Sequence, residues 1–467
     1  MALLYTQAAS VLDSVQAKQS SLKTIVHSSE LYKNKKQLVA VVCRTLQSYE
    51  TLVEIVRMVR LLTKEPQLTL NVACVLVYDY LFGGGLRCGG KLKSTIFRHK
   101  TQLKSAVERL KVKRGVTTKR ELIAPKSTQS VVLPRYVRVN TIKCTMADVV
   151  AHFESEGMMF RRRCESWGDI MELIESGGFV LDPHVDDVLV FRSSLDLHRH
   201  ELYTLGHIIL QGKASCLPAK LLAPPPGSLV LDACAAPGNK TSHLASIMKN
   251  SGTIFAFDLD VNRLDTMRTL LDKAGVTCAV LKHQDFLTVD PEDVNYSKVE
   301  YILVDPSCSG SGCLSHVDRA LDKQDKPTRR LRRLQKFQLA VLLHSFKFSS
   351  AKRIVYSTCS TYAEENEGVV SLALEQCNNT FHLTNVMPEW PRRGLPVFTD
   401  AAKCIRTSTE DMMQGFFIAA FERAQQNPNP PHTQVMSSRS APNTTRLPPQ
   451  TQSKSRKRKR THKSVVD

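Results

Sequence analysis

The sequence predicts an α/β protein whose largest part is built on a doubly wound, mostly parallel β-sheet. From residue 228 onward, short apolar runs alternate with segments that have apolar residues at helical spacing. Such alternation is typical of βαβ units, in which helices cover both faces of a parallel sheet. The chain has 467 residues, more than one hydrophobic core usually organises, so we expect two or three domains.

The elements of the sheet follow one another regularly. We expect helices over 240–250, 262–275, 332–346 and 364–377. The strands alternate with them, and they are expected over 228–235, 253–260, 277–286, 299–310 and 352–360. A last apolar run, "GFFIAAFER", predicts an antiparallel strand at an edge of the sheet.

Three further parts surround this sheet in the predicted organisation. Apolar positions at helical spacing, as in "SYETLVEIVRMVRLLT", predict a helical domain over 1–125. Shorter strands and helices predict a small α/β module over 130–215, and the sheet domain then covers 216–424. Residues 425–467 are too polar to bury a core and are expected to be disordered.

The charge of the chain points to a polyanionic partner. Its formal net charge is +20, and nucleic acid is the leading candidate, although a merely basic surface stays open. No leader pattern and no apolar stretch of ~20 residues is visible, so we expect an intracellular protein without membrane contact. The 13 cysteines are an odd number without a CxxC pair, which predicts neither a disulfide framework nor a metal site.

Two basic segments are candidates for contact with nucleic acid. The first runs through the helix expected at 98–114 and on to Arg120, and it is either an RNA-backbone contact or a solvated face. The second, Lys454–Lys463 in the tail, is typical of a nuclear or nucleolar address, with an RNA-binding arm as the alternative.

Residues whose side chains can bind ligands or react lie where the predicted strands end. In doubly wound sheets, ligands bind beyond the carboxyl ends of the strands. The turn "DACAAPGNKT" suits an anionic or zwitterionic cofactor, because small residues and a helix start admit a ligand to the backbone; a tight packing turn is the alternative. Asp258 fits a ribose diol and Asp285 an adenine amino group, although either could be a helix N-cap.

These motifs carry a resemblance to a known family. "DACAAPGNKT", "VDPSCSGSG", "VYSTCS" and "GFFIAAFER" resemble the motifs of the Nop2/Sun family of RNA cytosine-5 methyltransferases, over about residues 130–423. The N-terminal "KQLVAVVCRTLQSYE" and "ACVLVYDYLFGGGLRCGG" further resemble the subfamily-five members, which methylate large-subunit ribosomal RNA in the nucleolus.

The resemblance implies a fold and a function. The expected fold is a class I (Rossmann-like) S-adenosylmethionine-dependent methyltransferase domain with a mostly parallel seven-stranded sheet, preceded by a small α/β RNA-binding module. The expected activity is methylation of carbon 5 of a cytosine in large-subunit ribosomal RNA. A monomer in the nucleus and nucleolus is implied.

The resemblance also implies site residues. The cofactor is expected to be held by the turn, by Asp258 and Asp285, and by Asp305 at the junction with the base, with Arg263 as a weaker candidate. The turn residues concerned are Cys234, Ala235, Ala236, Pro237, Gly238, Asn239 and Lys240. In family members, Lys240 and Asp305 are also positioned to bind the cytosine. Gly212 departs from the pattern, since the family commonly has an acid after the glutamine of "QGKAS".

Two cysteines are candidates for covalent catalysis. A thiolate added to carbon 6 of cytosine activates carbon 5 toward an electrophilic methyl group. Cys308 and Cys359 both end strands that should be neighbours, about 4.8 Å apart, and the residues alone do not rank them. The resemblance implies that Cys359 attacks and that Cys308 assists release. Attack requires a lowered thiol pKa, which Lys240 or a helix start could supply.

The target base must leave its stack, which loop RNA makes easier. Arg138 and Asn140 are expected to hold RNA, and Tyr136 either stacks on a base or lies in the core. A ribosome-assembly RNA-binding factor with a vestigial methyltransferase fold is the alternative function. An exocyclic amino-methyltransferase would instead require Asn/Asp-Pro-Pro-Tyr/Phe where this chain has Asp-Pro-Ser-Cys.

Overall fold

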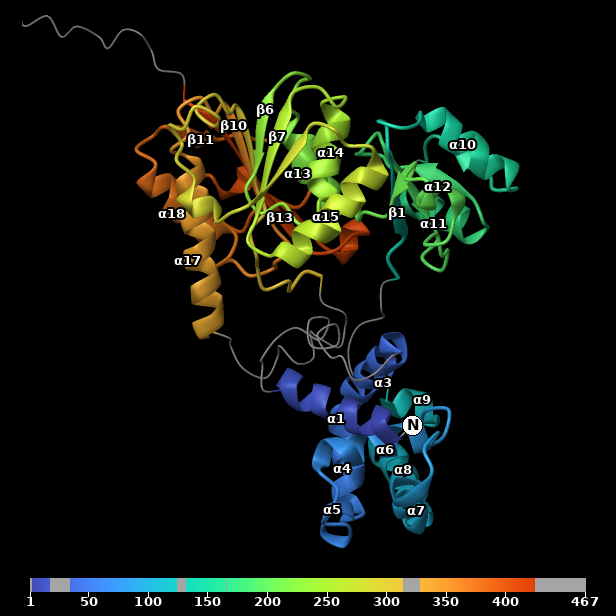
Figure 1. Cartoon of the computed structure of the whole chain (residues 1–467). Coiled ribbons are helices and arrows are strands. Elements are labelled where there is room, and N and C mark those ends of the chain that lie inside the picture. Colours follow the sequence, from blue (N-terminus) through green and yellow to red (C-terminus); the bar gives the residue numbers. More distant parts are fainter. Residues whose placement is uncertain (1, 17–33, 124–131, 165, 314–327, 425–467) are drawn as a thin grey trace, which may run out of the picture. The chain divides into compact units, whose positions relative to one another are not determined.

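The computed structural model describes residues 2–16, 34–123, 132–164, 166–313 and 328–424 (Figure 1). The basic cluster Lys454–Lys463 and the predicted disordered tail lie outside the described residues. Among the helices of this part of the chain, none combines the length and the apolar character that a membrane crossing needs.

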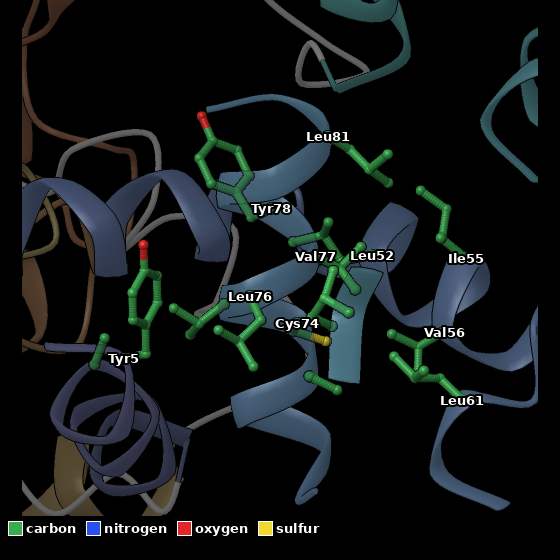
Figure 2. Close-up of a cluster of buried hydrophobic side chains, with 14 of the residues drawn as sticks. Tyr5, Leu52, Ile55, Val56, Leu61, Cys74, Leu76, Val77, Tyr78 and Leu81 are labelled. Atoms are coloured by element: carbon green, nitrogen blue, oxygen red, sulfur yellow. The ribbon is translucent and has the colours of Figure 1, made fainter. Parts of the chain in front are cut away.

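The N-terminal part is helical, as predicted. Its helices are α1 (Ala2–Gln16), α3 (Lys35–Gln47), α4 (Tyr49–Met58), α5 (Leu61–Lys64), α6 (Leu70–Leu81), α7 (Gly90–Arg98), α8 (Lys100–Arg114) and α9 (Lys119–Ile123). Helix α6 is apolar on nearly all sides, so it lies in the centre and α1, α3 and α4 pack against it. Figure 2 shows this core, with Cys74 and Leu76 of α6 among side chains from α1, α4 and α5.

Several of the basic side chains in this domain are already paired within it. Arg98 contacts Glu65 at 3.0 Å, and Lys113 and Arg114 share Glu54 at 2.8 and 2.6 Å. These pairs reduce the positive charge that this face offers to a polyanion. The prediction of RNA contact by these helices stays untested.

The small module is a five-stranded sheet in the order β2-β3-β4-β1-β5. Its elements are β1 (Arg135–Val139), α10 (Met146–Ser155), β2 (Phe160–Arg161), α11 (Trp167–Glu175), β3 (Phe179–Leu181), β4 (Val188–Phe191), α12 (Glu201–Thr204) and β5 (Ile208–Ile209). Helix α10 packs on one face of the sheet, where Val137 is buried. The other face, with Tyr136, joins a core shared with the following domain.

The largest domain holds the predicted doubly wound sheet. Its strands are β6 (Leu229–Asp232), β7 (Thr253–Asp258), β8 (Ala279–His283), β9 (Tyr301–Val304), β10 (Arg353–Thr358), β11 (Phe381–Leu383), β12 (Ile405–Thr407) and β13 (Phe416–Arg423). The main path is β11-β13-β10-β9-β6-β7-β8, and β12 pairs with β13 beside it. Strands β8, β7, β6, β9 and β10 are parallel, so the mostly parallel seven-stranded path is confirmed.

Helices cover both faces of this sheet (Figure 1). They are α13 (Lys213–Leu222), α14 (Asn239–Ile247), α15 (Val261–Ala274), α17 (Thr328–Ser345) and α18 (Glu367–Gln376), with short 3₁₀ turns η1 (Phe286–Thr288), η2 (Ala401–Lys403) and η3 (Thr409–Asp411). Alternate residues of β7 show the two layers, since Ile254 and Ala256 meet α14 and α15 while Phe257 lies in the core that includes α17 and α18.

One detail of the predicted sheet is wrong. Strand β13 is antiparallel as expected, but it is not an edge, because β10 and β11 pair with its two sides. The segments Phe381–Leu383 and Ile405–Thr407 are too short to stand out by alternation, so the sequence did not indicate them as strands.

Candidate active site

The site lies where the strand order reverses. From β6 the chain continues through β7 and β8 on one side and then returns to β9 and β10 on the other. Doubly wound sheets bind ligands at such a switch point, beyond the carboxyl ends of the strands. Asp232 ends β6, and Asp305 directly follows β9, so two carboxylates flank the reversal.

The turn after β6 is shaped by its own backbone. Ala235 N–H donates to Phe257 O at 2.8 Å, and Gly238 N–H donates to Ala235 O at 2.9 Å. Gly238 has a φ of +98°, and a Cβ there would lie 2.8 Å from Met267 Cγ. Glycine is therefore required, because both the left-handed conformation and the close packing exclude a side chain. Helix α14 then begins at Asn239.

Asp258 and Arg263 brace this turn. Asp258 accepts from Ala236 N–H at 3.2 Å and lies 3.2 Å from the Arg263 guanidinium. Arg263 also donates to the carbonyl oxygen of Ala236. These two predicted residues and the turn are thus brought together. The contacts of Arg263 are those of a residue that positions the turn.

Two further acids differ in their surroundings. Asp285 accepts from Leu287 N–H at 3.0 Å and caps the 3₁₀ turn η1, which is the N-cap that the sequence left open. Asp232 is buried and accepts from the Thr241 hydroxyl at 2.7 Å, while burial raises its pKa to about 7. Asp232 closes the strand without reaching the surface.

A lysine links the turn to the second half of the site. Lys240 Nζ lies 2.8 Å from Asp305 Oδ2 and donates to Ser215 Oγ at 3.1 Å. Although burial opposes its charge, Asp305 raises the pKa of Lys240 above its ordinary value, so the ammonium form persists. Ser357 donates to the other oxygen of Asp305 at 2.6 Å. Lys240 is therefore held as an ammonium and aligned with Asp305.

The two predicted cysteines converge. The Sγ atoms of Cys308 and Cys359 lie 3.1 Å apart, because β9 and β10 are parallel neighbours and each thiol follows its strand. Hydrogen bonds from the Cys308 and Cys313 thiols, with the charge of Lys240 nearby, hold the pKa of Cys359 well below its usual range. The pKa of Cys308 is raised, first by its hydrogen bond with Cys359 and then by burial. The two sulfurs share one hydrogen bond, in which either can be the donor.

A buried glutamate clamps both cysteine loops. Glu365 is fully buried and accepts from Ser309 N–H at 2.8 Å, from Gln338 Nε2 at 2.9 Å, and from the hydroxyl of Ser360. Ser309 follows Cys308 and Ser360 follows Cys359 in the chain. One carboxylate therefore sets the relative position of the two thiols.

Two glycines bring the same loops into backbone contact. Gly312 N–H donates to Cys359 O at 2.9 Å, and Gly415 N–H donates to Gly312 O at 3.2 Å. A Cβ on Gly312 would lie 1.9 Å from Gly415 O. The approach of the Cys308 loop to Cys359 thus depends on the absence of a side chain at Gly312.

The predicted RNA contacts of the small module are wrong. Arg138 and Asn140 are fully buried. Arg138 donates to Gln211 Oε1 at 2.8 Å and to Ser242 Oγ at 2.7 Å, and Asn140 donates to Ala274 O at 2.7 Å. Both residues therefore join the module to the methyltransferase-like domain. Strand alternation alone could not distinguish this buried network from an exposed polar face.

Tyr136 also belongs to the core. It is 7% exposed, and its hydroxyl donates to Met412 O at 2.6 Å, so the core alternative is confirmed. The sequence missed Ser215, Ser357, Glu365 and Gly415, which all act on the site from other segments. Three of them lie in stretches quoted above, Ser215 in "QGKAS", Ser357 in "VYSTCS" and Gly415 at the start of "GFFIAAFER", but nothing in those stretches indicated their contacts.

The residues at this edge fit an S-adenosylmethionine cofactor in their chemistry. A glycine turn that admits no side chain and carboxylates after successive strands match a zwitterionic ligand with a ribose diol and an amino group. The turn Cys234–Lys240 with Asp258, Asp285 and Asp305 would hold it. Cys234 is held as a neutral thiol, because burial raises its pKa, and is unsuited to attack.

One group of candidate metal ligands lies in the small module, among the described residues. Atoms of His152, Glu156 and His200 all lie within 4.8 Å of one another. Leu202 N–H donates to His200 Nδ1 at 3.2 Å, so the ring proton is on Nε2, which faces Glu156 at 3.1 Å. This arrangement is a hydrogen-bonded pair and presents no free ring nitrogen of His200 to a cation.

Three family models match separate parts of the chain. Residues 219–422 match 16S rRNA methyltransferase RsmB/F. Residues 133–211 match the ferredoxin-like domain of NOL1/NOP2/Sun domain family member 5, and residues 36–123 match its N-terminal domain.

Curated relatives extend over nearly the whole chain. A 28S rRNA (cytosine-C(5))-methyltransferase of Mus musculus is 47% identical, covering 99% of this chain and 98% of that protein. The 25S rRNA (cytosine-C(5))-methyltransferase rcm1 of Schizosaccharomyces pombe is 37% identical, covering 89% and 90%.

Solved structures agree on the fold. The crystal structure of PH0851 has a TM-score of 0.61 at 20% identity, covering 90% of this chain and 97% of that chain. A methyltransferase homologue protein from Pyrococcus horikoshii has a TM-score of 0.50 at 25% identity, covering 79% and 99%. With this fold, the paired thiols at the switch point and relatives matched end to end, the chain belongs to the NOL1/NOP2/Sun domain family of rRNA (cytosine-C(5))-methyltransferases, in the group of family member 5.

Proposed function

We propose that this protein methylates carbon 5 of a cytosine in large-subunit ribosomal RNA through a covalent intermediate with Cys359, and that Cys308 assists its release. The observation that carries the proposal is the sulfur pair, 3.1 Å apart and beside the charge of Lys240, and the division of roles between the two thiols follows the family resemblance. S-adenosylmethionine would supply an electrophilic methyl group at this edge of the sheet.

Cys359 is the attacking thiol in this proposal, and the nearby charge of Lys240 helps to lower its pKa. Its thiolate forms a bond to carbon 6 of the cytosine, and the electron pair of the carbon 5–carbon 6 double bond then makes carbon 5 nucleophilic. Lys240 and Asp305 are suited to hold the ring, since an ammonium donates to a ring carbonyl oxygen and a carboxylate accepts from the exocyclic amino group. The two groups are already aligned by their contact at 2.8 Å before the base arrives.

The position of Cys308 suits it to the release step. Cys308 Sγ lies 3.1 Å from Cys359 Sγ, so it stays beside the base once Cys359 is bound to carbon 6. After losing its proton to solvent, Cys308 can take the proton from carbon 5 as a thiolate. The electron pair of that C–H bond restores the double bond and expels the Cys359 thiolate.

A nucleolar location and a ribosomal RNA substrate belong to the same proposal. They are supported by relatives whose names specify 28S and 25S rRNA, and by the net charge of +20. The alternative, an assembly factor that only binds RNA, would not require a depressed thiol pKa beside an aligned lysine and aspartate.

The test uses the full-length protein and ribosomal RNA from cells that lack the gene. With S-adenosylmethionine, the wild type should add one cytosine mark that bisulfite sequencing locates, and Cys359→Ala should abolish it. Cys308→Ala should accumulate a protein–RNA adduct that survives denaturation, and the double variant should not. A matched control is Cys164→Ala in the small module, which should behave as the wild type.

Two outcomes would reverse the proposal. An adduct that persists when Cys359 is absent would exchange the two roles. A wild-type protein that binds the RNA but leaves no mark would favour the assembly factor.

A further inference from the structure

A cavity of about 310 Å³ lies between the small module and the methyltransferase domain. Arg135 and Tyr136 of β1 line one side, Gly212 and Lys213 lie at the start of α13, and Met413 and Gln414 belong to the turn before β13. The volume is at the lower end of the range for small-molecule sites and is sufficient for a nucleobase.

The cavity is connected to the thiol site on two sides. Gln414 Oε1 lies 3.2 Å from Cys313 Sγ, and Cys313 follows Gly312, whose N–H donates to Cys359 O at 2.9 Å. Ala214, another lining residue, precedes Ser215, whose hydroxyl accepts from Lys240 at 3.1 Å. The wall of the cavity is therefore linked, through neighbouring residues, to the loop of the nucleophile and to the lysine.

Gly212 lines the cavity without a side chain. Its backbone has φ −66° and ψ 140°, which any residue adopts, so the conformation does not demand glycine. A Cβ added there would meet nothing within 4 Å. Gly212 is an exposed lining residue without a side chain, and the chain could accommodate a larger residue there without strain.

Arg135 provides an unmatched donor at the wall. Lys213 is the other cation that lines the cavity, but its ammonium is paired with Asp182 at 2.8 Å, and both side chains are fully buried. Arg135 donates to Ser193 O at 3.1 Å, while its buried Nε has no hydrogen-bond partner among the described residues. An orphaned buried donor favours an acceptor on an incoming ligand.

We infer that this cavity holds the nucleotide adjacent to the target cytosine in the same RNA strand. The inference rests on the proposed function. The extruded cytosine and its neighbour share a phosphodiester, so the neighbour must lie beside the thiol site. A nucleotide combines apolar ring faces, which match Tyr136 and Met413, with edge and phosphate oxygens that Arg135 can bind. Gly212 then sets how large the flanking base can be.

The test is a double-mutant cycle that combines protein variants with RNA variants. The intact RNA is a short strand that carries the target cytosine. In two further RNAs an abasic nucleotide replaces the 5′ or the 3′ neighbour. One replacement should lower the wild-type kcat/KM about tenfold, as expected for one lost base contact. Gly212→Leu should lower kcat/KM on the intact RNA by a similar factor and lose nothing more on that abasic RNA.

Controls separate the cavity from the fold. Gly89→Leu is matched, because Gly89 also caps a helix, α7, at φ −106° with open space around it, and should leave kcat/KM unchanged. Gly212→Leu should keep the wild-type affinity for S-adenosylmethionine. Arg135→Gln provides a second variant, with the same non-additive pattern expected.

The failures are distinguishable. If the wild type marks no RNA, the proposed function fails. If the wild type marks the RNA but both variants methylate it at the wild-type rate, the cavity assignment alone fails. If the factors lost in kcat/KM from a variant and from either abasic RNA multiply when the two are combined, the cavity assignment is also overturned.

Discussion

The two halves of the active edge are built in different ways. In the cofactor half, a continuous turn, Cys234–Lys240, is held by its own backbone and by Asp258 and Arg263 from the next βα unit. In the thiol half, Cys308 and Cys359 are 51 residues apart and are held by Glu365 and by the contact between Gly312 and Gly415.

The difference separates local from long-range positioning. A continuous turn can change one contact and keep its shape, because the remaining backbone hydrogen bonds still define it. The two loops of the thiol half are not continuous in sequence, and they meet through a buried carboxylate, a glycine contact and bonds of Ser311 to Ser360 and Thr361. We therefore expect substitutions in the thiol half to lower the rate of chemistry, and those in the cofactor half to weaken cofactor binding.

The largest effect is expected for Gly312→Ala. The added Cβ would lie 1.9 Å from Gly415 O, so the Cys308 loop must move away from Cys359. A displacement near 1 Å at a reacting centre lowers rates by about 100-fold, and we expect at least this loss in kcat for RNA methylation. Affinity for S-adenosylmethionine, measured by equilibrium binding, should stay within about twofold, an allowance below one lost hydrogen bond.

Gly310→Ala is the matched control, since Gly310 is in the same loop with open space around it. Its φ of +71° makes the substitution strained by about 1 kcal/mol, but no atom is displaced. Equal losses of kcat in the two variants would show that loop strain, and not the contact with Gly415, is responsible.

The second effect is expected for Glu365→Gln. The amide removes the charge and replaces one acceptor oxygen with a donor, although Ser309, Ser360 and Gln338 all need an acceptor. Loss of one such charge-assisted bond is worth about 2 kcal/mol, so kcat should fall about 30-fold. Glu364→Gln, an exposed neighbour, should be neutral. A normal kcat of the Glu365→Gln enzyme would show that Glu365 is not needed to position the two thiols.

The same division explains what the sequence could predict. The parallel strands and the glycine turn follow from consecutive residues and regular spacing, and the structure places them as expected. Asp258 lies at the end of β7 beside the turn, and its role as a ribose ligand stays a prediction. The convergence of Cys308 and Cys359 followed from adjacent strands. Local pattern suffices wherever the contact partner is a backbone neighbour or the next βα unit.

The residues that the sequence missed or misplaced depend on distant partners. Glu365 was expected at the start of a helix, whereas helix α18 begins at Glu367 and Glu365 turns inward. Arg138 was expected to hold RNA, but Gln211, Ser242 and Ser246 enclose it. Polar residue types do not reveal which tertiary partner will bury them, because burial depends on the packing of two domains.

A smaller effect, of another kind, is expected for Asp258→Asn. Asp258 accepts from Ala236 N–H and faces Arg263, and its loss should weaken cofactor binding by about 1.5 kcal/mol, which raises KM for S-adenosylmethionine about tenfold. Saturating cofactor should restore kcat, unlike in the thiol half. Asp260→Asn, which retains an N-cap side chain on α15, is the control. A loss of kcat that excess cofactor does not relieve would contradict the separation of the site into a cofactor half and a thiol half.

The smallest effect concerns the pH dependence of Cys359 alkylation by iodoacetamide. Because its pKa is lowered, Cys359 stays a thiolate from pH 8 down to pH 6, and its labelling rate in the wild type should be nearly flat. Cys308→Ala removes the largest cause of that lowering, so the pKa of Cys359 rises toward its ordinary value. Protons then bind as pH falls, and labelling at pH 6 should drop several-fold below that at pH 8.

Peptide mass spectrometry on the full-length protein would follow Cys359 separately from the other cysteines. Asp258→Asn should leave the flat profile unchanged, because Asp258 contacts the turn and neither thiol. If Cys308→Ala also labels equally at both pH values, then the charge of Lys240 and the bond from Cys313 suffice to hold the thiolate. The thiol half would then depend on the cofactor half through Lys240, which pairs with Asp305 at the boundary between them.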